Sequence, residues 1–289
     1  MLFGETLVIR GGSGGGKTTL LNALIGELAA DAGVTRYNLP ELGPLDLTPA
    51  TEAQADALRK RIGILFQSGA LFSSPTLAEH VALPLREHSP VAPDIIDIVV
   101  AIKLQQVRML PHRDKFPAQL SGGQKKRAGL ARATALDPHV LFYDEPTAGL
   151  DPVTSSSIDE LIMDLSRKLH VTSIAVTHDM NSAFRIADRM IMLDRGRVVR
   201  NGPRAEFERL RVTPPERLST DADRRVHQFL RGCGDGPLTD AEGLSEFEKL
   251  LGVGGPVQRH SERRRDAHVA HPRSPCPPDR ACPPGAARR

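Results

Sequence analysis

The chain of 289 residues is 40% hydrophobic and 25% charged, which is typical of a globular protein with a buried core. Its net charge of +3 comes from residues 253–289, which contain eight Arg and three acidic residues. Residues 1–252 carry a net charge of −2, so we do not expect the folded part of the chain to bind nucleic acid. The sequence has no apolar run of 18 residues, and three cysteines (Cys233, Cys276 and Cys282) are too few for a disulfide framework, so neither a membrane span nor a secreted disulfide-rich fold is predicted. We expect a cytosolic protein of one or two domains.

The N-terminal residues predict a strand, a loop and a helix. Residues 5–10 read as a short buried strand that runs into a glycine-rich loop. Apolar residues recur at helical spacing after Lys17, and we expect this helix to end at Gly33. Residues 35–56 are rich in Pro, Leu, Gly and Thr without a clear period, so we predict irregular structure there, followed by a strand at Ile62–Phe66.

The central residues predict helices followed by alternating strands and helices. Residues 76–110 look mainly helical, and a further helix should begin near Gly123 and end before Asp137, because Pro138 disfavours helical geometry in the residue before it. The predicted elements that follow are a strand at Val140–Tyr143, a helix around Ser155–Leu169, a strand at Ser173–Thr177, and a hairpin formed by Ile191–Leu193 and Arg197–Arg200. The apolar strands are of the buried, parallel-sheet kind.

A phosphate-binding loop is predicted where Gly11-x-x-x-x-Gly16-Lys17-Thr18 joins the first strand to the first helix. Glycines allow backbone N–H groups to curl around nucleotide phosphates at the positive end of a helix. Lys17 would reach the β- and γ-phosphates, and the Thr18 hydroxyl would bind Mg²⁺. The alternative, a flexible Gly/Ser linker, gives no reason for Gly-Lys-Thr-Thr to begin an amphipathic helix. The predicted nucleotide-binding residues are Gly11, Gly12, Ser13, Gly14, Gly15, Gly16, Lys17, Thr18 and Thr19.

Two acidic residues, Asp144 and Glu145, end the apolar strand that begins at Leu141. Beside a phosphate loop, Asp144 would hold Mg²⁺ through water, and Glu145 would polarise the attacking water. Two acids after a strand alone would more often be a solvated turn. The phosphate loop upstream is what favours the catalytic interpretation.

The pentapeptide Leu120-Ser-Gly-Gly-Gln124 predicts a second anion-binding nest at the start of a helix. Two phosphate nests are redundant for one nucleotide, but they make sense if the second serves a nucleotide held by another copy of the chain. The residues concerned are Ser121, Gly122, Gly123 and Gln124. A plain helix cap is the alternative for the pentapeptide taken singly.

These motifs, in their order along the chain, resemble those of an ATP-binding-cassette (ABC) ATPase over residues 5 to about 210. The set also includes Gln67, GLDP at 149–152 and His178. The resemblance implies that Gln67 senses Mg²⁺ and the transmembrane partner and that His178 contacts the γ-phosphate. It also implies a head-to-tail dimer that clasps ATP and Mg²⁺, in which Ser121, Gly122 and Gly123 reach the partner's γ-phosphate and Asp151 lies at the interface.

The family fold implied is α/β, a P-loop NTPase of ABC type with a mainly parallel sheet core, a helical subdomain at about 75–135 and a small antiparallel β subdomain. We predict a nucleotide-binding domain at 1–211, a C-terminal extension at 212–252 and a basic Pro/Arg-rich disordered tail at 253–289. The tail is either a basic arm for anionic lipid or nucleic acid or simply a solvated end.

Two segments resemble a narrower group, the ATPases of lipid-trafficking importers of the maintenance-of-lipid-asymmetry (Mla), toluene-tolerance or Mce-associated type. They are residues 65–88 and 223–238. This resemblance implies a phospholipid or other hydrophobic cargo, a peripheral position on the cytoplasmic face of the inner membrane, and three partners: an Mla-type permease, a small STAS-like regulatory subunit and an Mce-type substrate-binding protein. In this group the C-terminal extension reaches toward the neighbouring ATPase; a helical cap over apolar surface is the alternative.

The position of the phosphate loop near Met1 raises a further hypothesis. In the ABC family an aromatic residue well ahead of this loop stacks on adenine, and Phe3 is too close to Gly11 for that role. We therefore hypothesise that Met1 is a truncated or misassigned start and that the small antiparallel subdomain is truncated with it. An in-frame stop codon close upstream, without an alternative start, would argue against this and would predict weaker nucleotide binding with the phosphate chemistry intact.

Three other functions stay open at this point. An ABC importer for another small solute would lack the 223–238 segment. A soluble ABC protein of DNA repair or translation usually carries coiled coils, zinc-binding insertions or a second cassette. A catalytically idle assembly subunit would hydrolyse no more ATP than a Glu145→Gln control, and an N-terminally truncated cassette would be only weakly active.

Overall fold

The structure of the chain is a computed structural model that describes residues 2–48, 50–234 and 236–239. These residues belong to one compact unit, Met1–Gly243. The predicted tail at 253–289, with Cys276 and Cys282, lies outside the described residues. None of the helices in the described ranges combines the length and the apolar character that a bilayer span requires.

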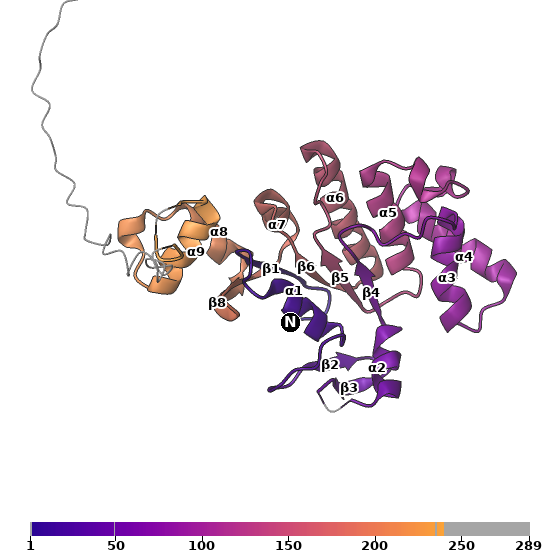
Figure 1. Cartoon of the computed structure of the whole chain (residues 1–289), viewed down its shortest axis with the longest axis horizontal. Coiled ribbons are helices and arrows are strands. Elements are labelled where there is room, and N and C mark those ends of the chain that lie inside the picture. Colours follow the sequence, from indigo (N-terminus) through magenta and orange to yellow (C-terminus); the bar gives the residue numbers. More distant parts are fainter. Residues whose placement is uncertain (1, 49, 235, 240–289) are drawn as a thin grey trace, which may run out of the picture. The chain divides into compact units, whose positions relative to one another are not determined.

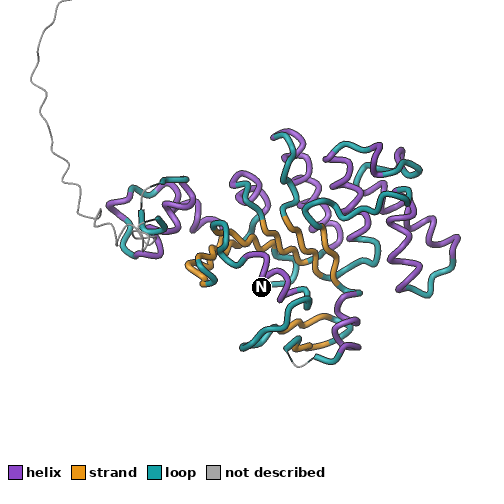
Figure 2. Tube along the Cα trace, viewed as in Figure 1, coloured by secondary structure: helices purple, strands orange, loops and turns teal. Residues whose placement is uncertain are grey.

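A six-stranded sheet forms the centre of this unit, with strand order β4-β5-β6-β1-β7-β8 (Figures 1 and 2). Its strands are β1 (Thr6–Gly11), β4 (Ile62–Leu65), β5 (Val140–Asp144), β6 (Thr172–Val176), β7 (Arg189–Asp194) and β8 (Arg197–Pro203). The first five strands in this order are mutually parallel, and β8 runs antiparallel to β7. The predicted parallel sheet and its closing hairpin are therefore confirmed.

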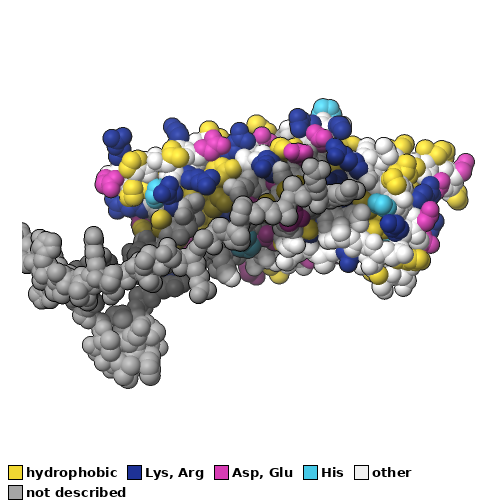
Figure 3. All heavy atoms as spheres, turned by 90° about the horizontal axis from the view of Figure 1, so that it is seen from above, with side chains coloured by type: hydrophobic (Ala, Val, Ile, Leu, Met, Phe, Trp, Pro, Cys, Tyr) yellow, Lys and Arg dark blue, Asp and Glu magenta, His cyan; other side chains and the backbone are white. Residues whose placement is uncertain are grey.

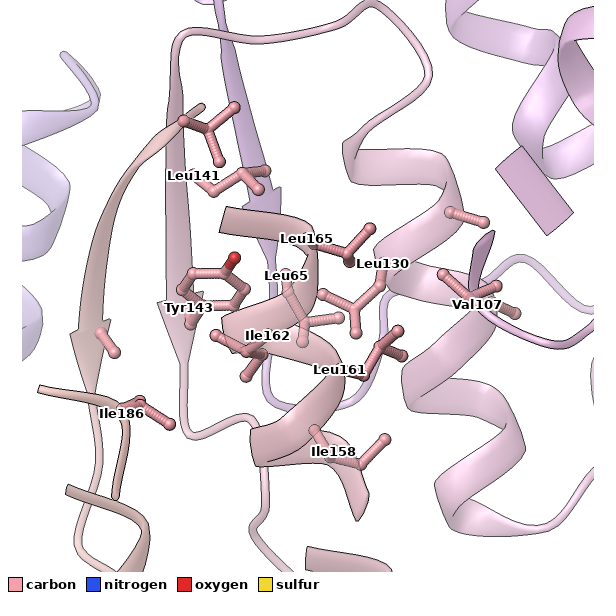
Figure 4. Close-up of a cluster of buried hydrophobic side chains, with 14 of the residues drawn as sticks. Leu65, Val107, Leu130, Leu141, Tyr143, Ile158, Leu161, Ile162, Leu165 and Ile186 are labelled. Carbon is pink, nitrogen blue, oxygen red and sulfur yellow. The ribbon is translucent and has the colours of Figure 1, made fainter. Parts of the chain in front are cut away.

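Alternate side chains of the five parallel strands enter two separate cores, because successive side chains of a strand point to opposite faces. In β5, Leu141 and Tyr143 lie in one core, and Val140 and Phe142 lie in the other. Figure 4 shows part of the first core, where Tyr143 faces the helix that carries Ile162. Burial on both faces explains why these strands read as continuous apolar runs.

Helices α5 (Gly122–Ala133), α6 (Pro152–Leu169) and α7 (Met180–Ile186) cover the first face (Figure 1). Two further helices, α3 (Leu77–His88) and α4 (Pro93–Gln106), pack on α5 and on each other. Short 3-10 turns at Leu110–His112 and Pro117–Gln119 lead into α5. The mainly helical structure predicted for 76–110 is confirmed, with a break between α3 and α4.

The opposite face carries α1 (Lys17–Leu24), a small antiparallel pair of strands, β2 (Arg36–Leu39) and β3 (Gly43–Asp46), and α2 (Glu52–Arg59). The irregular structure predicted for 35–56 is therefore wrong. Each of these strands has only four residues, and burial of Tyr37, Leu39 and Leu45 against the main sheet selects them. Such short segments carry too little periodicity to be seen in the sequence.

Helix α1 ends at Leu24, so its predicted extension to Gly33 is also wrong. Ile25 is the C-terminal cap, and Gly26 adopts a left-handed conformation (φ +78°) that stops the helix. The buried Ile25 belongs to the packing surface but follows the last helical residue.

The C-terminal part described here packs on the same chain. Helices α8 (Arg204–Val212) and α9 (Asp221–Arg231) contact each other and β8, and a 3-10 turn at Pro215–Arg217 joins them. Phe207, Val226 and Leu230 are buried in the first core. This packing agrees with the helical cap expected as one alternative for residues 223–238. Contact of the extension with the neighbouring ATPase and the domain boundaries after 211 and 252 stay predictions.

Basic, acidic and hydrophobic side chains are interspersed where Figure 3 leaves the described atoms in view. This mixture agrees with the small net charge of −2 for residues 1–252.

Candidate functional site

A cavity of about 690 Å³ lies where β1, β5 and β6 end at their carboxyl termini. In open α/β sheets this edge is the usual place for a ligand. The residues that line the cavity are Ser13, Gly14, Lys17, Thr18, Gln67, Asp144, Glu145, Thr147, Ala148, Gly149, Leu150, Ser155, Val176, His178 and Asp179. The phosphate loop, Gln67, the two acids and His178 therefore meet although they are far apart in the sequence.

The phosphate loop turns tightly from β1 into α1. A Cβ atom on Gly11 would lie 2.2 Å from the carbonyl oxygen of Leu193, so only glycine fits there. The N–H of Gly15 donates to the carbonyl of Gly12 at 3.2 Å, and Gly16, with φ +92°, caps α1. The positive end of α1 consequently faces the cavity, and a helix end of this kind favours anions.

Lys17 lies buried over this loop. Its Nζ donates to the carbonyl oxygens of Gly11 at 3.0 Å and Gly12 at 2.7 Å. Burial lowers the pKa of Lys17, and the negative charge of Glu145 partly restores it. An ammonium group is therefore held beside the loop N–H groups, and the hydroxyl-bearing Thr18 lines the same cavity.

Glu145 adopts a left-handed backbone conformation (φ +49°), which is uncommon for a residue with a side chain. Its N–H donates to the carbonyl of Val176 at 2.9 Å, and its own carbonyl accepts a hydrogen bond from Nζ of Lys126 at 2.8 Å. These two bonds hold the chain in the turn that aims the carboxylate at the cavity. Strained backbone of this kind is concentrated at functional sites.

The Glu145 carboxylate meets His178 on one side and the cavity on the other. Oε2 accepts the backbone N–H of His178 at 3.1 Å, and Oε1 lies 3.4 Å from Nε2 of the imidazole. Oε1 is buried without a hydrogen-bond partner. A buried carboxylate oxygen without a partner is costly, so this atom fits a site where a polar ligand or a water molecule is bound.

Oxygen donors for a metal ion line the cavity as well. They are the Thr18 hydroxyl, the Gln67 amide and the Asp144 carboxylate. Burial raises the pKa of Asp144, and the neighbouring Lys126 ammonium partly offsets this. Within the described part of the chain no group of three or more His, Cys, Asp or Glu forms a metal cage. A single carboxylate with neutral oxygens fits Mg²⁺, which takes its remaining ligands from water and phosphate.

The Ser-Gly-Gly segment does not reach this cavity. Ser121 is the N-cap of α5: its hydroxyl accepts the N–H of Gln124 at 3.3 Å, and the Gln124 amide oxygen accepts the N–H of Ser121 at 3.0 Å. Ser121 and Gly122 are exposed. The plain helix cap considered from the sequence is therefore present, and the first two residues of this segment are exposed on the surface of the chain.

Asp151 is exposed beside this segment and caps α6. Its Oδ1 accepts the N–H groups of Val153 and Thr154, both at 3.0 Å. A Cβ atom on Gly123 would lie 2.5 Å from Cγ2 of Thr154, so the starts of α5 and α6 are in close contact. Of the loop residues expected from the sequence, Ser13, Gly14, Lys17 and Thr18 line the cavity, whereas Gly11, Gly12, Gly15, Gly16 and Thr19 do not. The second expected set, Ser121, Gly122, Gly123, Gln124 and Asp151, lies wholly outside the lining.

Two buried cations beside the site were missed from the sequence. Lys126 is 4% exposed and lies on the face of α5 that buries Gly123 and Leu130, at helical spacing. Arg10 is 3% exposed and interrupts the apolar run of β1. Both residues could have been found from the sequence, because each is a charged residue at a position where the spacing of its neighbours predicts a buried, apolar side chain.

Comparisons with known proteins agree on the family of the chain. Residues 2–148 match the family described as ABC transporter. The chain is 39% identical to the probable ribonucleotide transport ATP-binding protein mkl of Mycobacterium leprae, over 87% of this chain and 69% of that protein. It is 37% identical to the intermembrane phospholipid transport system ATP-binding protein MlaF of Haemophilus influenzae (86% and 88% covered) and 36% identical to MlaF of Escherichia coli K12 (81% and 81%).

Solved structures share the fold. The dimeric post-hydrolysis state of the ATP-binding cassette MJ0796, bound to ADP and Pi, superposes with a TM-score of 0.62 at 29% identity, covering 70% of this chain and 87% of that one. The cbiO1 protein of Clostridium perfringens, part of the ABC transporter complex cbiONQ, gives a TM-score of 0.63 at 29% identity over 75% and 86% of the two chains. Together with the phosphate loop and the acidic strand end, these matches show that the chain belongs to the ABC transporter family and is an ATP-binding-cassette ATPase.

Proposed function

We propose that this chain is the ATP-hydrolysing subunit of an ABC transporter that moves phospholipid or a similar hydrophobic compound across the cell envelope. The observation that carries the hydrolytic part is the meeting of Lys17, Glu145 and His178 around one cavity, with a carboxylate oxygen of Glu145 buried and unpartnered. The lipid cargo is supported by the MlaF relatives and by the resemblance of residues 65–88 and 223–238.

The residues of the cavity have distinct proposed roles in nucleotide binding. The backbone N–H groups of Gly11–Gly16, with Thr19 in the first helical turn, bind the phosphates of ATP at the positive end of α1. The Lys17 ammonium neutralises the β- and γ-phosphates. Thr18, Gln67 and Asp144 would hold Mg²⁺, which supplies charge neutralisation at the phosphates when bound.

Glu145 and His178 form the proposed hydrolytic pair. The unpartnered Oε1 of Glu145 is available to accept a proton from an attacking water, because Oε2 is already held by the His178 N–H. The imidazole of His178 is 59% exposed at the cavity mouth, where it is accessible to the γ-phosphate. The hydrogen bond from the His178 N–H to the Glu145 carboxylate keeps the carboxylate and the imidazole close to each other.

A second copy of the chain completes the site. Ser121–Gln124 and Asp151 do not line the chain's own cavity, and Ser121, Gly122 and Asp151 are exposed, so we propose that this group closes over the nucleotide of a head-to-tail partner. ATP then stabilises the closed dimer because it contacts both copies only in that state. The dimeric cassette among the solved relatives supports this arrangement.

The remaining partners follow from the same assignment. We propose peripheral attachment to an Mla-type permease at the cytoplasmic face of the inner membrane, together with a small STAS-like subunit and an Mce-type substrate-binding protein. Closure of the dimer drives the permease, and hydrolysis through Glu145 resets it.

The hydrolytic proposal is tested by ATP turnover of the full chain and its Glu145→Gln variant. Loss of a general base lowers the rate by about 10²–10⁴, and the amide keeps the size of the side chain, so ATP binding should persist. Equal turnover by the two proteins would contradict the proposal. The cargo is tested by reconstituting the chain with its permease in vesicles and supplying fluorescent phospholipid or, as the competing cargo named for the mycobacterial relative, a ribonucleotide.

A further inference from the structure

Arg10 is a buried cation that contacts three separate elements near the site. Its Nη1 donates to the carbonyl oxygen of Thr177, and its Nη2 lies 3.7 Å from the sulfur of Met180 at the start of α7. The guanidinium carbon lies 5.4 Å from the ring centre of Phe229 in α9. Arg10 therefore links β1, the segment that carries His178, and the C-terminal extension.

The environment of Arg10 is costly for a positive charge. Within the described residues no carboxylate forms an ion pair with Arg10, and its Nε is buried without a hydrogen-bond partner. Burial lowers the pKa of Arg10 to about 10, while the charges of Glu145 and Asp179 favour its protonated form. An apolar residue would fit the interior of β1 at lower cost, so stability of the strand does not account for an arginine there.

The contacts of Arg10 lead directly to the hydrolytic pair. Thr177, whose carbonyl it binds, immediately precedes His178, and the N–H of His178 holds Oε2 of Glu145. A shift of the Thr177 carbonyl would therefore turn the peptide group that orients both side chains. Charge-assisted hydrogen bonds of this kind are about twice as strong as neutral ones.

Phe229 covers the other side of the guanidinium and is held in place by the packing of α9. Val226 and Leu230, on the same helix, are buried in the first core. Two ion pairs fix α9 to the hairpin, Arg225 with Asp194 at 3.1 Å and Asp223 with Arg200 at 3.3 Å. The aromatic face consequently stays over the cation, where it replaces part of the lost hydration.

We propose that Arg10 is a positioning residue through which α9 of the C-terminal extension fixes the Thr177–His178 peptide and thereby sets the rate of ATP hydrolysis in the same chain. The inference rests on the proposed roles of Glu145 and His178. It gives residues 223–231 a function within the chain, whether or not the extension also contacts a partner. Displacement of α9 lowers turnover while the phosphate loop continues to bind ATP.

The first test compares Arg10→Met with Arg10→Lys in the full chain, with kcat and KM for ATP as readouts. We expect kcat to fall about tenfold in Arg10→Met with KM within twofold, and Arg10→Lys to recover part of the loss because it keeps a donor. In a Glu145→Gln background the Arg10→Met change should have no further effect on the residual turnover, since the Thr177–His178 peptide acts on hydrolysis through the Glu145 carboxylate. An equal loss in both backgrounds would overturn the proposal.

The second test removes the Phe229 ring and leaves Arg10 in place, which keeps the proposal testable if Arg10→Met does not fold or if residual turnover in the Glu145→Gln background is too slow to measure. Phe229→Leu should lower kcat and speed amide hydrogen exchange in residues 177–186 without nucleotide. The matched control is Phe207→Leu, the same change at a buried α8 position whose ring has no guanidinium contact within the described residues. Equal effects of the two variants on this segment would refute the link. Absent hydrolysis by the wild-type chain would instead refute the proposed function, while the exchange comparison would still test Arg10.

Discussion

The chain contains two glycine-rich segments that each open a helix, and their surroundings differ. Gly11–Gly16 leads into α1 and is surrounded within the same chain by Lys17, Glu145 and His178. Ser121–Gly123 leads into α5, is exposed at Ser121 and Gly122, and lines no part of that cavity. A helix end alone offers N–H groups and a partial positive charge. Because Gly11–Gly16 has Lys17 and Glu145 as charged neighbours in the same chain, it forms a nearly complete phosphate site, whereas Ser121–Gly123 forms half of one.

The two segments are nevertheless connected through α5. Its first turn carries Gly123, and one turn further Lys126 holds the carbonyl of Glu145. A movement of α5 caused by a nucleotide at its N-terminus would therefore shift Glu145, the proposed general base in the chain's own cavity. The comparison thus predicts two half-sites that depend on each other.

The largest effect is expected from Lys17→Met, which removes the cation of the complete segment. Loss of one preorganised electrostatic group lowers turnover by about 10²–10³. Burial lowers the pKa of Lys17, so its charged form is disfavoured in the folded chain and the variant should melt no lower than wild type. ATP turnover and thermal melting measure the two effects. Lys60→Met, at the exposed end of α2, is the control.

Ser121→Asp tests the incomplete segment with a change that keeps the helix cap. Aspartate is as good an N-cap as serine, so α5 should remain folded, but its charge would face the phosphates of the partner's nucleotide. Repulsion of about 4 kcal/mol at short range near a protein surface predicts a loss of turnover of roughly 100-fold or more. Thr76→Asp likewise replaces a hydroxyl N-cap by aspartate, at the start of α3, and should leave turnover unchanged.

A mixture of the two inactive variants sharpens this test. In a mixed dimer one site combines an intact Lys17 with an intact Ser121, so mixing Lys17→Met with Ser121→Asp should restore turnover that neither variant has alone. Turnover that stays at the level of the separate variants would indicate that each chain works with its own two segments.

Gly123→Ala should have a moderate effect on stability. The new methyl group would lie 2.5 Å from Cγ2 of Thr154 and force apart the starts of α5 and α6. Overpacking of this kind lowers the free energy of unfolding by about 1–3 kcal/mol, which denaturant melts can measure. Thr154→Ser removes the clashing methyl, so the double variant should recover most of the loss. No recovery would place the cause elsewhere than in this contact.

The smallest effect is expected from Asp151→Asn at the start of α6. Hydrogen bonds from the Thr154 side chain, and from the N–H groups of Thr154 and Val153, hold the pKa of Asp151 below its ordinary value of 3.8. A carboxyl with a lowered folded pKa stabilises the fold above 3.8, and this contribution is lost as pH falls through the folded value. Thermal melts should therefore show wild type above the asparagine variant near neutral pH, with the difference closing as the pH falls below 3.8 and through the lowered folded pKa of Asp151. A gap that persists in acid would rule out the charge as its source.

The sequence by itself determined the parallel strands and the chemistry-bearing motifs. Continuous apolar runs such as Val140–Tyr143 identify buried strands because both faces of a parallel sheet are covered. The phosphate loop and the Asp144-Glu145 strand end were recognisable because each needs particular residue types at a fixed local spacing.

Only the tertiary structure decided the short elements and the distant contacts. The strands β2 and β3 are selected by burial of Tyr37, Leu39 and Leu45 against the sheet. The bonds from Lys126 to Glu145 and from Arg10 to Thr177 join residues 19 and 167 positions apart, and nothing in local periodicity encodes which carbonyl a buried cation will meet. Local spacing fixes a residue's neighbours along its own helix or strand, whereas the partner of a buried charge is fixed by the packing of whole elements.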